Sequence, residues 1–63
     1  MKASICLEYK DESEVWFDFE SSDSDIDAKA TLLMVCRGTL MASSACRIVA
    51  YNEEGFDICS YIK

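Results

Sequence analysis

The chain has 63 residues, of which 51% are hydrophobic when alanine, tyrosine and cysteine are counted, and its net charge is −6. This length predicts one domain, residues 1–63, and this apolar content favours a folded core over disorder. Nine of the twelve acidic residues lie in residues 1–27 beside only two lysines, a balance of −7, whereas residues 28–63 have a balance of +1. Such an acidic field disfavours direct binding to nucleic acid or to an anionic membrane and favours a basic protein surface as the partner.

Compartment and cysteine chemistry follow from the same composition. No run of about 18 apolar residues could span a bilayer, and charged residues follow the N-terminus too closely for a signal peptide, so we expect a soluble, cytoplasmic protein. None of the cysteines belongs to a C-x-x-C pair, and the chain has no histidine. We therefore expect free structural thiols rather than disulfides or zinc ligands at the four positions, which are Cys6, Cys36, Cys46 and Cys59.

The first third of the chain predicts an antiparallel hairpin. Apolar and polar side chains alternate along residues 3–10 and again along residues 15–20, which is the pattern of strands with one buried face. Between them, Asp11, Glu12 and Ser13 are residues that favour a short turn.

A helix is predicted next. The segment from Ser24 to Asp27 has the S-x-x-D form of a capping box, in which side-chain oxygens bind the free amides of a helix start. Good helix formers continue to Arg37, Gly38 is suited to ending the helix, and residues 39–44 fit either more helix or the next strand. The apolar stripe expected to face the core consists of Ile26, Ala30, Leu33 and Arg37.

A second hairpin completes the chain. Residues 46–51 alternate, the segment Asn52–Gly55 supplies a turn with a glycine placed for positive φ, and residues 56–62 alternate again. We therefore predict an α+β fold of ββαββ type, with a four-stranded, mainly antiparallel sheet and one helix packed on one face. The expected core comprises Ile5, Leu7, Val15, Phe17, Phe19, Ile26, Ala30, Leu33, Ile48, Phe56, Ile58 and Ile62.

One helix cannot cover both faces of such a sheet. The alternation places on the uncovered face Trp16, Asp18, Glu20, Arg47, Val49, Tyr51, Asp57, Cys59 and Tyr61. Two interpretations stay open: a binding surface, because Trp, Tyr and Arg are enriched in binding hot spots, or a solvated face stabilised by cross-strand aromatic pairs. The candidate partner-binding residues are Trp16, Asp18, Glu20, Tyr51 and Tyr61, with Asp11, Glu12 and Glu14 at the rim.

Catalytic and metal sites are not predicted. Without histidine there is no imidazole base, and neither a G-x-S-x-G motif nor a P-loop is present. The segment Asp23–Asp27 resembles the start of a calcium loop, but Ala28 and Met34 stand where the loop requires glycine and glutamate. We therefore expect no enzyme activity, cofactor or metal.

Three functional hypotheses of different classes follow. The first is an inhibitor or regulator that places its acidic, aromatic sheet face or an open strand edge on a basic protein surface. The second is a structural homo-oligomer, at the simplest a homodimer, that assembles through the same face or edge. The third, a small enzyme or metal protein, has the least support in the sequence.

The order of the predicted elements resembles small phage-encoded proteins that disable bacterial defences, including anti-CRISPR proteins and phage antitoxins. At residue level, Ala28-Lys29, Cys36, Gly38-Thr39 and Met41 are similar to the passage from helix to strand in one anti-CRISPR family. The resemblance implies stoichiometric blocking of a host defence or nucleic-acid-processing protein in the host cytoplasm, with the acidic half standing in for phosphates. The acidic first hairpin departs from that family's basic residues, so no functional residue is carried over.

Overall fold

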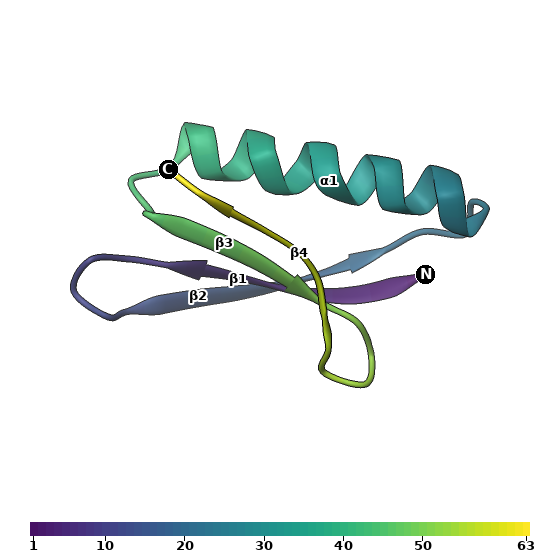
Figure 1. Ribbon diagram of the computed structural model, residues 1–63, viewed down its shortest axis with the longest axis horizontal. Coiled ribbons are helices and arrows are strands. Elements are labelled where there is room, and N and C mark those ends of the chain that lie inside the picture. The colour runs from purple at the N-terminus through teal and green to yellow at the C-terminus, as the bar shows by residue number, and fades with distance from the viewer.

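The computed structural model describes residues 1–63 and contains four strands and one helix (Figure 1). In chain order the elements are β1 (Lys2–Glu8), β2 (Glu14–Glu20), α1 (Asp25–Ala42), β3 (Arg47–Tyr51) and β4 (Asp57–Ile62). The predicted ββαββ architecture of the α+β class is confirmed.

The strands form one antiparallel sheet in the order β2-β1-β3-β4. Both hairpins are closed by turns at the predicted places, and Gly55 adopts the predicted positive φ, at 89°. Glu12 in the first turn also has a positive φ, at 71°. Because β1 and β3 lie in the middle, β2 and β4 are the two edges of the sheet.

The core lies between the sheet and α1, which runs along β3 and β4 (Figure 1). Leu32 and Cys36 of the helix are fully buried, as are Ile5 and Ile48 of the central strands. The complete core cluster consists of Ala3, Ile5, Leu7, Leu32, Cys36, Leu40, Ala45, Ile48 and Ala50.

The helix begins as predicted but ends later. Ser24 is the N-cap, and its hydroxyl accepts a hydrogen bond from the Asp27 amide at 3.3 Å. Gly38 does not end the helix, which continues to Ala42, so the helical alternative for residues 39–44 holds as far as Ala42. Ser43 caps the helix by donating its amide and hydroxyl to the Leu40 carbonyl. Burial of Leu40 offsets the cost of about 1 kcal/mol that a glycine imposes inside a helix.

The predicted helix stripe is also wrong. The buried residues are Ala28, Leu32, Cys36 and Leu40, whereas Ile26 is 83% exposed, Ala30 and Arg37 are exposed and Leu33 is half-buried. The helix has apolar residues on several of its own faces, so helical periodicity alone does not select the face that meets the sheet.

A β-bulge changes the faces of β4. The register shifts between Ala50 and Tyr51, so that Cys59 lies opposite Ala50 and Tyr61 opposite Ile48, both on the side of the helix. The expectation that Cys59 and Tyr61 lie on the uncovered face is therefore wrong. Ile62 moves to that uncovered face and is 80% exposed, because one extra residue reverses the side of every residue that follows it.

Two further residues of the predicted core are exposed. Val15 lies on the face of the sheet that was expected to be buried. It is nevertheless 49% exposed, because it belongs to the edge strand β2, beyond the part of the sheet that α1 covers. Phe56 precedes β4 in the turn and is 66% exposed. Phe17 and Phe19 on β2 are half-buried against the core cluster.

Candidate functional site

We call the sheet face without a helix the open face. The register places one residue of each of three strands in a row across it, where Trp16 of β2 lies opposite Cys6 of β1, and Cys6 opposite Val49 of β3. The neighbouring row contains Asp18, Ser4 and Tyr51 in the same strand order, and Asp57 of β4 lies opposite Tyr51.

The main feature of the open face is a stacked pair of aromatic rings. The centroids of the Trp16 and Tyr51 rings are 5.7 Å apart, with an interplanar angle of 25°. The stacked rings therefore bridge β2 and β3 across β1. Beneath the stacked rings, Cys6 is 1% exposed and Val49 is 0% exposed, although no helix lies on this face. The stacked rings therefore act as a local cover, while Trp16 itself stays 54% exposed.

Carboxylates surround the aromatic pair. Glu14 accepts a hydrogen bond from the Trp16 indole Nε1 at 3.4 Å, and Asp18 flanks Trp16 on the other side along β2. Glu8 forms an ion pair of 3.5 Å with Arg47, the one basic side chain that the register places near the rings. A partly exposed pair of this kind contributes little to stability, so its effect is mainly to neutralise one carboxylate.

The electrostatics of the covered groups reflect this setting. Burial, helped by the charges of Glu14 and Glu8, raises the pKa of the Cys6 thiol to about 11. Burial, helped by Asp57, also raises the pKa of the Tyr51 hydroxyl. Both groups are therefore neutral at physiological pH, and neither has the lowered pKa of a nucleophile.

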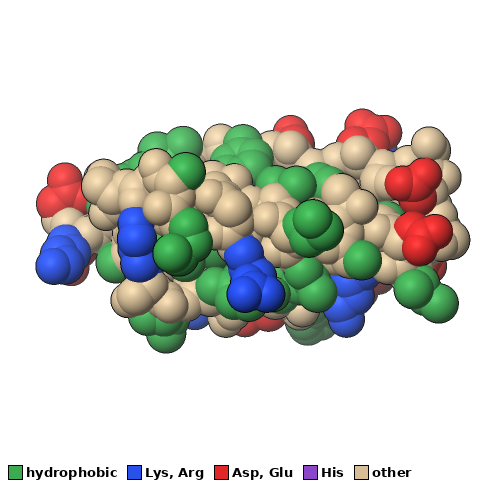
Figure 2. Space-filling model, turned by 90° about the horizontal axis from the view of Figure 1, so that it is seen from above, with side chains coloured by type: hydrophobic (Ala, Val, Ile, Leu, Met, Phe, Trp, Pro, Cys, Tyr) green, Lys and Arg blue, Asp and Glu red, His purple; other side chains and the backbone are tan.

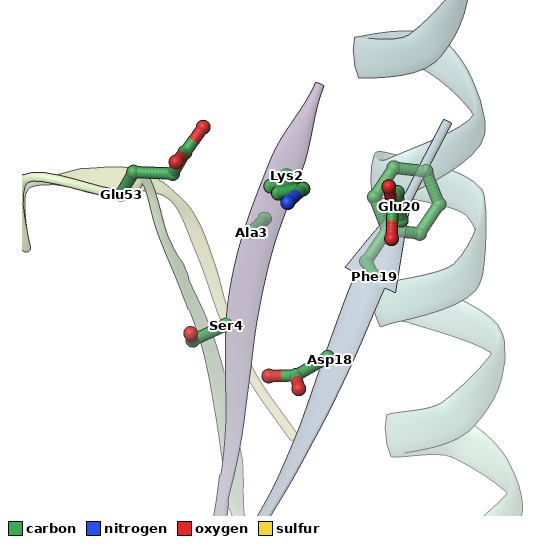
Figure 3. A pocket seen from close by; sticks show the side chains of 7 residues that line it. All are labelled: Lys2, Ala3, Ser4, Asp18, Phe19, Glu20 and Glu53. Carbon is green, nitrogen blue, oxygen red and sulfur yellow. The ribbon is translucent and has the colours of Figure 1, made fainter. Parts of the chain in front are cut away.

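A shallow hollow of about 270 Å³ lies beside the aromatic pair, near the start of β1 (Figure 3). Asp18 points from β2 towards β1, Ser4 points from β1 towards the opposite side, and Glu53 comes from the β3–β4 turn on that side. Lys2 and Glu20, which are register partners, lie at one end. Three carboxylates and one lysine thus line a space that suits a cationic side chain better than an anion.

The structure brings together only part of the predicted site. Trp16, Asp18, Tyr51, Glu14 and Glu20 share the open face.

The remaining three predicted residues lie elsewhere. Asp11 and Glu12 lie in the exposed β1–β2 turn, where the hydroxyl and amide of Ser13 bind Asp11 and lower the pKa of its carboxyl. Tyr61 lies on the other face, half-buried, with the Arg37 guanidinium 5.8 Å from its ring centroid. Tyr61 is therefore not part of the open-face surface.

Sequence reasoning missed the supporting residues. Val49 is among the residues expected on the uncovered face and Cys6 among the expected structural thiols, and the burial of both depends on a ring pair that forms only across β1. Glu53 belongs to the predicted turn between β3 and β4, and it reaches the hollow because β3 pairs with β1. The outward alternation in β2 and β3 was the one signal available in the sequence.

The cysteine and metal predictions can be compared with the structure. All four cysteines are free, as predicted, with Cys6 and Cys36 buried. Burial, together with the nearby Cys59, raises the pKa of the Cys36 thiol to about 12. No three His, Cys, Asp or Glu side chains gather in an arrangement that could hold a metal ion.

The chain was compared with known proteins by sequence and by structure. No protein-family model, curated protein or solved structure matches it. The structure itself contains no helix of the length and apolar character needed to cross a membrane.

Proposed function

We propose that this protein is a non-enzymatic regulator that binds a basic surface of another protein through its open face. The observation that carries the proposal is the exposed Trp16–Tyr51 stack surrounded by carboxylates. Aromatic rings with a half-buried base and an exposed upper side supply contact area with little loss of side-chain entropy, and acidic neighbours select a cationic partner.

Arginine is the side chain that fits this surface best. Its planar guanidinium stacks on Trp or Tyr rings and pairs with carboxylates at its edge. The open face offers both, because Trp16 stands between Glu14 and Asp18 on the same strand. A second cation would enter the hollow lined by Asp18, Glu20 and Glu53.

Proteins that handle nucleic acids carry arginine and lysine clusters where they hold phosphates. A chain with a charge of −6 that occupies such a cluster would compete with the nucleic acid. The proposed mode of action is therefore stoichiometric blocking, in the manner of a phage-type inhibitor of a host defence or nucleic-acid-processing protein.

The test is affinity capture from a bacterial lysate, with quantitative mass spectrometry and three forms of the protein. The parent is compared with the double variant Asp18→Lys plus Glu20→Lys and with a control, Asp23→Lys plus Glu54→Lys. Both variants change the net charge equally at exposed positions, but only the first lies on the open face. A true partner is retained by the parent and the control and is lost by the open-face variant.

Binding kinetics of a captured partner then separate charge from contact. Charge reversal at Asp18 and Glu20 should slow association by about tenfold or more, because electrostatic steering depends on local charge. High salt should slow association of the parent in the same way, because it screens that charge. Trp16→Ala should instead speed dissociation. Equal binding by the parent and the open-face variant, or equal losses in both charge variants, would show that the partner does not recognise this surface.

A further inference from the structure

The outer side of α1, which faces away from the sheet, is apolar although no other part of the chain covers it. The side packed on the sheet consists of residues four apart, which are Ala28, Leu32, Cys36 and Leu40. On the outer side Met34 and Met41 are 75% and 72% exposed. A helix that is apolar on all sides is typical of one that is buried on all sides. The outer side of α1 therefore has the character of an interface.

The exposed residues of this side follow a regular spacing of three and four. Residues at this spacing form one narrow stripe along a helix, as in the seam of a two-stranded coiled coil. In α1 the stripe consists of exposed residues only, which are Asp27, Ala30, Met34, Arg37 and Met41. Figure 2, viewed from the side of the helix, shows hydrophobic side chains spread along the middle of this face, with the acidic ones mainly towards its ends and rim. We call these five residues the outer stripe.

The outer stripe carries one charge of each sign. Asp27 lies in the first turn of α1, and Arg37 lies in its second half. Neither side chain has an ion-pair partner within the chain, in which the one salt bridge joins Glu8 and Arg47. The Arg37 guanidinium, 5.8 Å from the centroid of the Tyr61 ring, stays exposed. A second outer stripe that runs in the opposite direction offers the opposite charge at each of the two positions.

We infer that the protein forms a homodimer in which the outer stripe packs against the outer stripe of a second copy, antiparallel and about a two-fold axis. The register that places Asp27 opposite the partner's Arg37 also places Ala30 opposite the partner's Met34. The two-fold axis repeats both pairs, so each methionine of the two central layers meets a small side chain and the helices can approach closely. The dimer has four layers, in the order sheet, helix, helix, sheet.

Charge selects this arrangement over the other occupants. A parallel pair of helices would bring Asp27 against the partner's Asp27 and Arg37 against the partner's Arg37, and like charges at such short range are unfavourable. An anionic membrane surface is repelled by the net charge of −6. The helix itself is neutral, because Asp25 and Asp27 balance Lys29 and Arg37. Two acidic copies therefore meet at the part of the surface where their repulsion is smallest.

The dimer leaves the open face free. Because the two helices lie between the two sheets, both Trp16–Tyr51 stacks point outward, on opposite sides of the dimer. Such a dimer would be bivalent towards a partner with repeated basic sites. The dimer does not rest on the proposed regulatory function, since it is formed by the other side of the molecule.

Sedimentation equilibrium of the purified chain, from micromolar to millimolar concentration, tests the inference. The expected result is a reversible approach to twice the chain mass of 7.1 kDa. Met34→Lys should raise the dimer dissociation constant by more than about tenfold, because a substitution in an isologous interface acts twice. The matched control is Ile62→Lys, which replaces an apolar residue that is 80% exposed on the open face and should leave the dimer intact.

A pair of charge variants tests the register. Asp27→Arg and Arg37→Asp each place like charges opposite each other at both ends of the helix pair. Each variant alone should therefore sediment as a monomer at concentrations where the parent is a dimer, while circular dichroism shows that it is folded. An equimolar mixture of the two variants should recover the dimer, because every facing pair then joins one basic and one acidic side chain.

Three results would overturn the inference. A parent that stays monomeric at millimolar concentration would assign the outer stripe to a different protein. A dimer that survives Met34→Lys in folded protein would place the interface elsewhere. A mixture of the two charge variants that stays monomeric, where the parent dimerises, would exclude the antiparallel pairing of Asp27 with the partner's Arg37.

Discussion

The two faces of the sheet are buried by different means. On one face α1 packs against the sheet, and together they form a core cluster of nine residues in which Leu32 and Ile48 are fully buried. On the open face two residues, Cys6 and Val49, reach the same burial beneath the stacked rings of Trp16 and Tyr51. The helix-covered face therefore owes its burial to a dedicated layer, whereas the open face uses side chains that are themselves candidates for binding.

This difference links stability with function on one face only. A substitution under the helix should affect folding without touching the binding surface. A substitution in the ring pair should affect both, because the same rings cover Cys6 and face the solvent. Three predictions test this distinction, in order of expected size.

The largest effect is expected under the helix. Leu32→Ala should lower the free energy of unfolding by about 3 kcal/mol, because it removes a fully buried side chain and leaves a cavity. In a domain of 63 residues this is a large share of the total stability. Urea unfolding followed by circular dichroism measures it, and a loss below about 1 kcal/mol would show that the helix layer is not the main core.

The second prediction concerns alkaline pH and both faces. The pKa of Cys6 rises from 9.0 to about 11 and that of Cys36 to about 12, so folding favours the neutral thiols. The stability that they contribute is complete below pH 9 and is lost as the pH rises towards 11 or 12, by about 2 kcal/mol for Cys6.

Unfolding measured at pH 7 and again near pH 11 checks this loss. Cys6→Ala should remove the share that belongs to the open face, and Cys36→Ala the share under the helix. If neither variant reduced the alkaline loss, the two thiols would not be its source.

The smallest effect is expected at the ring pair. Trp16→Ala should lower the free energy of unfolding by about 1 kcal/mol, because the indole is about half exposed. Its sharper consequence is kinetic: alkylation of the Cys6 thiol should become about tenfold faster as the cover is removed and its pKa falls.

Peptide mapping after labelling with iodoacetamide isolates Cys6 from the other three thiols. The control is Phe56→Ala, which removes an exposed aromatic ring in the β3–β4 turn, outside the strands that form the open face. Equal labelling of Cys6 in the parent and in Trp16→Ala would mean that the ring pair does not protect it.

Much of the fold could be predicted because its signals are local. Alternation in β1, β2 and β3 assigned side chains to the correct faces, and the Ser24 cap marked the helix start. The part of the site on β2 and β3, including Trp16 and Tyr51, was found for the same reason.

The residues that were assigned wrongly depend on contacts between elements. Tyr61 and Ile62 changed faces because of one bulge, which adds a residue without altering the pattern of polar and apolar letters. Likewise, Ile26 and Leu32 are both apolar helix residues, and only the position of α1 over β3 and β4 decides that Leu32 is buried.

By itself, the sequence determined the order of the elements, the concentration of acidic charge in the first hairpin and the free thiols, because each depends on composition or on neighbours along the chain. Tertiary structure alone decided which strands became edges, which side of the helix was buried and how Trp16 and Tyr51 met across β1. The physical reason is that burial is a property of pairs of surfaces, and a periodic pattern describes only one surface of each pair.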